Sequence, residues 1–360
     1  MLRVPSRIDP SWWQHVVEVA DRRLGSPRRS LAELVAETSA LYTTRRDAID
    51  STRRGDALQA RMRFFMPRDL IKVLFPLDEL RRAGRLPTDR TWRVLDLGCG
   101  LGTTTFGVSW FARLHDVADA LHVCALDVSD EALELFAAID PPGVPLQLDS
   151  RVADVRARPT LPKGFDLVVL GLVLNELDGD AEKLATVRWA AEAMAPGGAM
   201  IVLEPALREP TRALQRVRDA LALQDDLHVF APCLHEQPCP MLANERDWCH
   251  EERPFELPEA LVPVARAAKL RSDRSTFSYL SVCRTPRPTT DAFRVVSSRL
   301  KTKGKLELIV CRGDGELEKL RRLDRHATEA NAAFGEAKRG DVLERKGTGR
   351  IDPDEQVTRG

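Results

Sequence analysis

The sequence contains no run of 18 or more apolar residues, which excludes an apolar membrane-spanning helix. Its first 22 residues also lack the apolar h-region of a signal peptide, because arginines alternate there with Asp9, Glu18 and Asp21. A transit peptide would be poor in such acids. We therefore expect a cytoplasmic protein with no membrane partner.

An excess of basic residues is missing as well. The chain has 54 Lys and Arg residues against 54 Asp and Glu residues, so its formal net charge is zero. Proteins that bind nucleic acid through their overall charge are usually basic, and that class is disfavoured. Any contact with RNA must be local, and two stretches qualify: residues 45–63, which carry six arginines, and residues 294–305, RVVSSRLKTKGK, which contain no acid. A solvated helix face is the alternative.

The seven cysteines are an odd number in a chain without an export signal, which argues against a disulfide framework. Cys99 and Cys124 lie in or beside apolar strand-like segments, so we expect both to be small buried residues. The other five lie outside those segments and need a separate explanation: Cys233, Cys239, Cys249, Cys283 and Cys311.

The spacing of apolar residues divides the chain into successive regions. We predict an N-terminal helical region over residues 1–90 and a Rossmann-like domain over 91–210. A helix and a cysteine-rich segment follow over 211–285, and then a small β unit over 286–336. Residues 337–360 are charged and contain glycine, which predicts a disordered tail.

The central region alternates apolar strands with segments of helical period, a pattern typical of an α/β fold with a parallel sheet. Strands this apolar suit a sheet that is covered on both faces. The predicted strands are residues 92–98, 121–128, 146–154, 165–174 and 199–205.

A glycine-rich turn, Asp96 to Gly102 with the sequence DLGCGLG, closes the first predicted strand. Thr103 stands where the dinucleotide fingerprint has its third glycine, so NAD is disfavoured. The pattern resembles class I methyltransferases, which bind S-adenosylmethionine (SAM). That resemblance implies that Asp96 orients the methionine end, that Asp127 binds the ribose hydroxyls and that Asp154 accepts from the adenine amino group. The residues expected to line the methionine end are Gly98, Gly100 and Gly102.

The catalytic chemistry is less clear from the sequence. After the fourth predicted strand the run is GLVLNEL, which lacks the Pro-Pro-aromatic clamp of base-modifying amino-methyltransferases and also a Pro-Cys pair. Asn175 and Glu176 in this run are the candidate catalytic residues. Either they position a substrate, or they only cap the following helix.

Three of the remaining cysteines follow the spacing C-x5-C-x9-C within a segment that has no regular period. Prolines at positions 232, 238 and 240 would stiffen this loop. Thiols in such a loop suggest metal ligands, with a fourth ligand from Cys311, Cys283, His235 or His250. The spacing allows zinc or an iron–sulfur cluster, and a loop that binds nothing is the alternative.

The segments APCLHEQPCP, DWCHEE, FSYL and KGKLELIVCRGDG follow the glycine-rich core. Together they resemble the family of mitochondrial small-ribosomal-subunit assembly methyltransferase-like proteins and their bacterial relatives, over roughly residues 57–341. The resemblance implies a 4Fe–4S cluster, with Cys283 as a structural residue. The cluster ligands that it implies are Cys233, Cys239, Cys249 and Cys311.

The same resemblance implies a partner, the small ribosomal subunit and its rRNA. Lys301, Lys303 and Lys305 lie close in sequence to the fourth cysteine and would then be phosphate contacts. We therefore predict a SAM-dependent methyltransferase-like protein that acts on or binds rRNA. The alternatives are a ribosome-assembly factor that binds SAM without methyl transfer, and a zinc-stabilised methyltransferase of small molecules.

Overall fold

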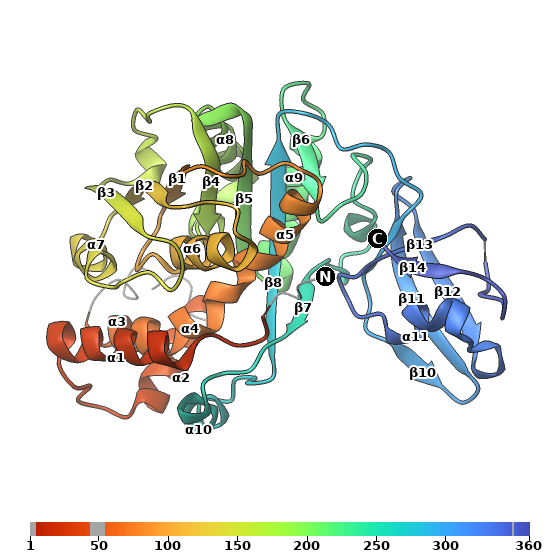
Figure 1. Cartoon of the computed structure of the whole chain (residues 1–360), viewed down its shortest axis with the longest axis horizontal. Helices are drawn as coiled ribbons and strands as arrows, with labels where there is room; N and C mark the ends of the chain where they lie inside the picture. Colours follow the sequence, from red (N-terminus) through yellow and green to blue (C-terminus); the bar gives the residue numbers. More distant parts are fainter. Residues whose placement is uncertain (1–4, 44–54, 348) are drawn as a thin grey trace.

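The computed structural model describes residues 5–43, 55–347 and 349–360. These residues form a larger lobe around one sheet and a smaller C-terminal lobe around a second sheet (Figure 1). None of the described helices combines the length and the apolar character that a membrane crossing requires.

The first sheet has the strand order β3-β2-β1-β4-β5-β8-β6, and β7 pairs with β8. Strands β1 to β5 are parallel, whereas β8 runs antiparallel to β5. The five strands predicted from the sequence are all present. The strands of this sheet are β1 (Trp92–Leu97), β2 (Leu121–Asp127), β3 (Leu146–Val152), β4 (Phe165–Gly171), β5 (Met194–Pro205), β6 (His228–Ala231), β7 (Glu251–Pro254) and β8 (Arg274–Cys283).

The direction of strand addition reverses between β1 and β4. The chain builds outward from β1 to β3 and then returns to the other side of β1. At such a switch point the loops that leave the carboxyl ends of neighbouring strands diverge, and a crevice opens between them. The predicted Rossmann-like α/β fold is thus confirmed, and it brings the segments that follow β1, β2, β3 and β4 to one edge.

Both faces of this sheet are covered, as the apolar strands predicted. Neighbouring residues of β1 point to opposite faces, so Val94 packs into one hydrophobic core and Leu95 into another. The helices that connect or follow the strands are α6 (Thr103–His115), α7 (Asp130–Ala137), α8 (Gly179–Ala191), α9 (Arg208–Leu221) and α10 (Val262–Ala267).

The N-terminal region is helical and covers one face of the sheet (Figure 1). After α1 (Pro10–Leu24) and α2 (Leu31–Thr43), residues 56–82 form an almost unbroken helical run. Its parts are α3 (Asp56–Ala60), a π-helical turn (Arg61–Phe65), α4 (Met66–Asp69), a 3-10 turn (Leu70–Val73) and α5 (Leu74–Arg82).

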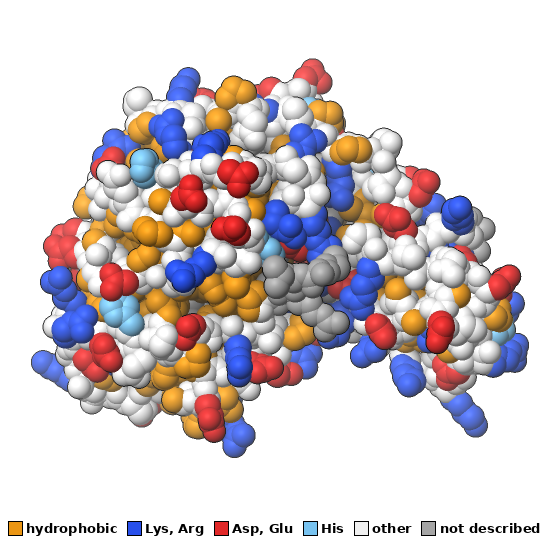
Figure 2. All heavy atoms as spheres, in the orientation of Figure 1, with side chains coloured by type: hydrophobic (Ala, Val, Ile, Leu, Met, Phe, Trp, Pro, Cys, Tyr) orange, Lys and Arg blue, Asp and Glu red, His pale blue; other side chains and the backbone are white. Residues whose placement is uncertain are grey.

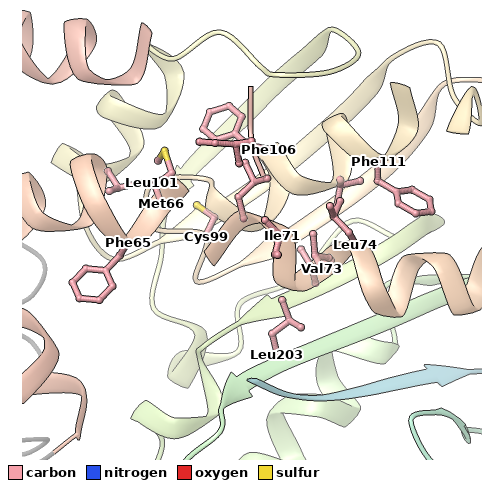
Figure 3. Packing of buried hydrophobic residues seen from close by; sticks show 14 of the residues in the cluster. Phe65, Met66, Ile71, Val73, Leu74, Cys99, Leu101, Phe106, Phe111 and Leu203 are labelled. Atoms are coloured by element: carbon pink, nitrogen blue, oxygen red, sulfur yellow. The ribbon is translucent and has the colours of Figure 1, made fainter. Parts of the chain in front are cut away.

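The helical run lies close against α6. A Cβ atom at Gly107 would be only 2.5 Å from the carbonyl oxygen of Leu70, so glycine permits this approach. Figure 3 shows side chains of the run, such as Ile71, pointing toward Phe106 of α6, whereas Phe65 turns away from them. The N-terminal region therefore extends from the sheet face to the glycine-rich turn.

The second sheet has the strand order β10-β11-β9-β13-β14, and β12 pairs with β11. Residues 337–360, predicted to be disordered, contribute β13 and β14 to it in the described part of the tail. The prediction failed because Leu343, Ile351 and Val357 are buried in this lobe, although charged residues surround them in sequence. The elements are β9 (Phe293–Val295), β10 (Leu300–Thr302), β11 (Lys305–Arg312), β12 (Leu317–Leu323), α11 (Ala332–Glu336), β13 (Val342–Arg345) and β14 (Val357–Arg359).

A group of charged side chains, here called the interlobe network, joins the two lobes. It consists of Glu79, Glu251, Arg253, Arg294 and Asp341. The Arg294 guanidinium is 3% exposed and lies 2.8 Å from the carboxylate of Glu79 and 3.7 Å from that of Glu251. Arg253 lies 2.8 Å from Glu251 and 2.9 Å from Asp341. Each buried arginine therefore has two carboxylate partners.

The basic segment 294–305, predicted as a local RNA contact, divides into buried and exposed parts. Arg294 is buried in the interlobe network, and Lys305 pairs with Glu307 at 3.1 Å. Lys301 and Lys303 are exposed on and beside β10. Figure 2 shows Lys and Arg side chains at the end of the lobe where Figure 1 places β10, and charges of both signs over the rest of this face.

Candidate functional site

The glycine-rich turn leaves β1 in a conformation that side chains disfavour. Gly98, Gly100 and Gly102 have φ angles of 66°, 52° and 74°. A Cβ atom would lie 2.6 Å from Val173 at Gly98 and 2.3 Å from the Phe136 ring at Gly102. These glycines keep the backbone close to its neighbours, and of the three Gly98 is among the residues that line the cavity described below.

Asp127, at the end of β2, holds this turn in place. One carboxylate oxygen accepts a hydrogen bond from the backbone N–H of Gly100 at 2.7 Å. The other accepts from the N–H of Ser129 at 2.9 Å. The side chain also lines a cavity formed by the described residues, here called the main cavity. The structure thus places Asp127 beside the glycine-rich turn, where the sequence predicted a ribose contact.

Asp154 follows β3 and lines the same cavity. Its carboxylate accepts from the N–H of Arg156 at 2.8 Å and lies 3.9 Å from the Arg156 guanidinium. This side chain is 43% exposed, so a ligand can reach it. Its predicted contact with adenine stays a prediction.

Asp96 occupies a different position, beneath the turn. It is 1% exposed, and its Oδ2 accepts from the Thr105 hydroxyl at 2.6 Å. Its Oδ1 is buried and has no hydrogen-bond partner among the described residues. Burial raises the pKa of Asp96 to about 7, and the Asp127 carboxylate adds to this effect. The predicted contact with a methionine group would involve this buried Oδ1.

Asp96 should make the stability of the ligand-free chain depend on pH. In the unfolded chain Asp96 ionises at its ordinary pKa of 3.8, whereas in the folded chain it ionises only near pH 7. The contribution of Asp96 to the free energy of unfolding therefore falls as pH rises from about 4 to 7. One pKa unit is worth about 1.4 kcal/mol, and the loss is on the order of a few kcal/mol. Urea unfolding should show Asp96→Asn gaining stability over wild type from pH 5 to pH 8. A constant difference over this range would contradict the assignment.

The main cavity has a volume of about 330 Å³ and lies at the carboxyl edge of the parallel strands. Ligand pockets begin at about this size. The N-terminal region supplies one wall, including Arg61, Phe65, Arg68 and Lys72. Sequence analysis did not connect these residues with the cofactor site, because no motif links them to the glycine-rich turn. Arg61 belongs to the basic stretch 45–63, of which residues 45–54 lie outside the described part of the chain.

The candidate catalytic residues Asn175 and Glu176 also line this cavity, on a 3-10 turn (Leu174–Glu176) after β4. The Asn175 side-chain amide donates to the carbonyl of Leu172 at 2.7 Å, and Asn175 is 7% exposed. The Glu204 carboxylate accepts from the N–H of Leu174 at 2.9 Å. The turn is thus held firmly at the cavity wall, while the role of the two residues stays a prediction.

The four cysteines proposed as ligands line one smaller cavity of about 50 Å³, next to β8 and β11. Cys233, Cys239 and Cys249 belong to the loop between β6 and β7, and Cys311 lies on β11 in the second sheet. Cys283 lies elsewhere, buried on β8, whereas the Nε2 of His235 is 3.3 Å from the Sγ of Cys311. The residues are Cys233, Cys239, Cys249 and Cys311.

A buried arginine on α9 adjoins this cavity. Arg218 is 2% exposed, donates to the Asp219 carboxylate at 2.7 Å and lines the cavity with the thiols. The carboxylate of Asp219 in turn accepts from the N–H of Cys239 at 3.0 Å. Burial raises the pKa of Cys239 and Cys311 to about 12. Among the described residues, no three Cys, His, Asp or Glu side chains are arranged to hold a metal ion.

A family model described as mitochondrial small ribosomal subunit Rsm22 matches residues 76–344, which is more than half of the chain. The chain belongs to this family. The resemblance seen in the sequence is thus confirmed. No curated protein matches this Rsm22-family chain.

Solved structures similar to the Rsm22-family chain include several methyltransferases. The plantazolicin methyltransferase BpumL, solved with a substrate analogue and SAH, is 10% identical with a TM-score of 0.39 over 75% of this chain and all of that one. A ribosomal protein L11 methylase from Lactobacillus delbrueckii subsp. bulgaricus is 15% identical, with a TM-score of 0.34 over 59% and 78%. A SAM-dependent methyltransferase from Leishmania major is 17% identical, with a TM-score of 0.31 over 53% and 69%.

Proposed function

We propose that this Rsm22-family chain is a SAM-dependent methyltransferase-like protein that acts on or binds the rRNA of the small ribosomal subunit. The observation that carries the proposal is the main cavity, where a glycine-rich turn meets the carboxylates of Asp127 and Asp154. The family supports the ribosomal partner through its description as mitochondrial small ribosomal subunit Rsm22. Lys301 and Lys303 remain exposed for phosphate contacts.

The cavity fits the chemical groups of SAM. Asp127 would bind the ribose hydroxyls and Asp154 the adenine amino group, while the glycine-rich turn would leave room for the methionine end. The buried Oδ1 of Asp96, which lacks a partner among the described residues, fits the ammonium of that methionine. When bound, SAM supplies a methyl group on a sulfonium, which a nucleophile attacks as the carbon–sulfur bond breaks.

Residues of the chain would then place the acceptor opposite the methionine end. Asn175 and Glu176 lie on the 3-10 turn that borders the cavity, and Lys72 and Asp69 form an ion pair at 2.9 Å on the N-terminal wall.

The test of methyl transfer uses immature small subunits and SAM with a labelled methyl group. Label in rRNA or in a ribosomal protein supports methyl transfer. Absence of label with the cofactor site saturated contradicts it.

Asp127→Asn should weaken SAM binding by about 10- to 100-fold, because the variant loses charge-assisted hydrogen bonds to the ribose and holds Gly100 less well. Calorimetric titration with SAM measures the change. Asp149→Asn is the matched control, since Asp149 is an exposed aspartate on β3. Equal affinity of wild type and Asp127→Asn would contradict the assignment of the cofactor site.

A second candidate function is a ribosome-assembly factor that binds SAM without transferring its methyl group. The hydrogen bond between the Asn175 amide and the Leu172 carbonyl favours it, because this amide is already engaged within the chain. In this case wild type would bind SAM and leave the subunits unlabelled. Asp127→Asn would still impair their maturation in cells that depend on this chain. Normal maturation with the variant would exclude a role for SAM.

We also propose that Cys233, Cys239, Cys249 and Cys311 hold a 4Fe–4S cluster. Four thiols lining one cavity supply a suitable donor set, and the buried Arg218 supplies a positive charge that would favour their thiolate form when the cluster is bound. When bound, the cluster would tie the loop before β7 to β11. Zinc is the alternative occupant. Iron, sulfide and absorbance at about 400 nm in protein purified without air would support the cluster. Stoichiometric zinc without iron would overturn it.

A further inference from the structure

The side chain of Arg61, in the N-terminal region, reaches the middle of the glycine-rich turn. A Cβ atom built on Gly100 would lie 2.3 Å from the Nη2 of Arg61 and 4.0 Å from the Oδ2 of Asp127. The guanidinium therefore lies directly over the middle glycine of the turn. It occupies the wall of the main cavity at the end expected to receive the methionine group.

The π-helical turn that begins at Arg61 accounts for this orientation. Arg61 and Phe65 both line the main cavity. Arg63, in the same turn, points elsewhere and donates to Asp21 at 2.8 Å and to Gln59 at 2.7 Å. Single π turns within helices occur often at functional sites, because they shift the side chains that the helix presents.

The charges of SAM suggest what Arg61 would bind. SAM carries two positive groups, the sulfonium and the ammonium, and one negative group, the α-carboxylate. The carboxylates of Asp96 and Asp127 beside the turn suit the positive groups and ribose, but a carboxylate ligand requires a cation at the same end.

Among the described residues, three other cations line the cavity wall, and none of them is among the atoms nearest to a Cβ built on Gly100. Lys72 is 2.9 Å from Asp69, and Arg68 is 3.9 Å from the same carboxylate. Arg156 lies 3.9 Å from Asp154, at the end predicted for adenine. Of these four cations, Arg61 is the one placed over Gly100.

We propose that Arg61 binds the α-carboxylate of SAM, so that the N-terminal helical run completes the cofactor site. A planar guanidinium can hold a carboxylate through two parallel hydrogen bonds. The inference rests on the proposed binding of SAM and adds to it a residue from outside the Rossmann-like domain. SAM binding would then hold the π-helical turn against the glycine-rich turn.

Calorimetric titration of the full chain with two ligands tests this assignment. SAM carries the carboxylate, whereas decarboxylated SAM keeps the sulfonium, the amine and the nucleoside. Arg61→Ala should weaken binding of SAM by about 10- to 100-fold and change the affinity for decarboxylated SAM by less than about threefold. Arg61→Lys should bind SAM with intermediate affinity, since it keeps the charge but not the paired hydrogen bonds.

Arg156→Ala is the matched control, because it removes an arginine from the same cavity at the opposite end. Arg156→Ala should change the affinity for SAM and the affinity for decarboxylated SAM by the same factor. The inference is overturned if Arg61→Ala binds SAM as wild type does, or if it loses affinity for both ligands to the same extent. Failure of wild type to bind SAM would overturn the proposed cofactor and this inference together. Circular dichroism and thermal unfolding establish that each variant is folded.

Discussion

Cys249→Ala should yield a chain that purifies without iron or sulfide and that lacks the absorbance at about 400 nm. Cys249 shares its cavity with the three other proposed ligands, and alanine offers no donor atom. The loop before β7 has no regular structure around Cys249, so its order in the loaded protein would depend on the bound group. We also expect a lower melting temperature and faster proteolysis of this loop.

Cys283→Ala is the control for this experiment. Cys283 is 3% exposed on β8 and does not line the cysteine cavity, so its replacement should leave iron and sulfide unchanged. Cys311→Ala provides an independent second test from the other sheet. Wild-type iron and sulfide in both Cys249→Ala and Cys311→Ala would contradict the proposed ligand set.

Arg294→Leu should lower the free energy of unfolding by about 3–5 kcal/mol, because it leaves Glu79 without its cation and Glu251 with Arg253 alone. Arg294 lies between Glu79 of α5 and Glu251 of β7, and it also donates to the carbonyl of Gly340 at 2.8 Å. Guanidinium unfolding followed by circular dichroism measures the loss.

Arg299→Leu is the matched control, since Arg299 is exposed. This replacement should lower the free energy of unfolding by less than about 0.5 kcal/mol. A second comparison uses Glu79→Gln with Arg294→Leu. Removing both charges should recover part of the lost stability, because fewer unpaired charges stay buried. Equal effects of Arg294→Leu and Arg299→Leu would show that the interlobe network contributes little.

Local patterns predicted the centre of the molecule well. Strands β1, β2 and β4 and the predicted part of β5 were found because each is a short apolar run, whereas β3 (LQLDSRV) is more polar. The glycine-rich turn was recognised because its positive φ angles favour glycine at fixed positions. Asp127 lies beside this turn because the carboxyl ends of neighbouring parallel strands meet at one edge.

Features that depend on distant contacts were not predictable in this way. The two carboxylates that pair with Arg294 are far from it in sequence, so the sequence did not show that this arginine is buried in an ion pair. The tail was predicted to be disordered because its few apolar residues are isolated among charges, yet β13 pairs with β9. Arg61 reaches Gly100 only because the helical run packs on α6, and no motif predicts that packing.

The position of Cys311 on β11 has a consequence for the order of events during synthesis. Residues 233–249 emerge from the ribosome well before residue 311, and β11 must also pair with β9 and β12 before its cysteine faces the others. The proposed four-thiol site is therefore incomplete on a nascent chain and becomes complete only in a finished one. Chains that hold iron would then be those whose C-terminal lobe has folded, and chains truncated before Cys311 would lack one of the four proposed ligands.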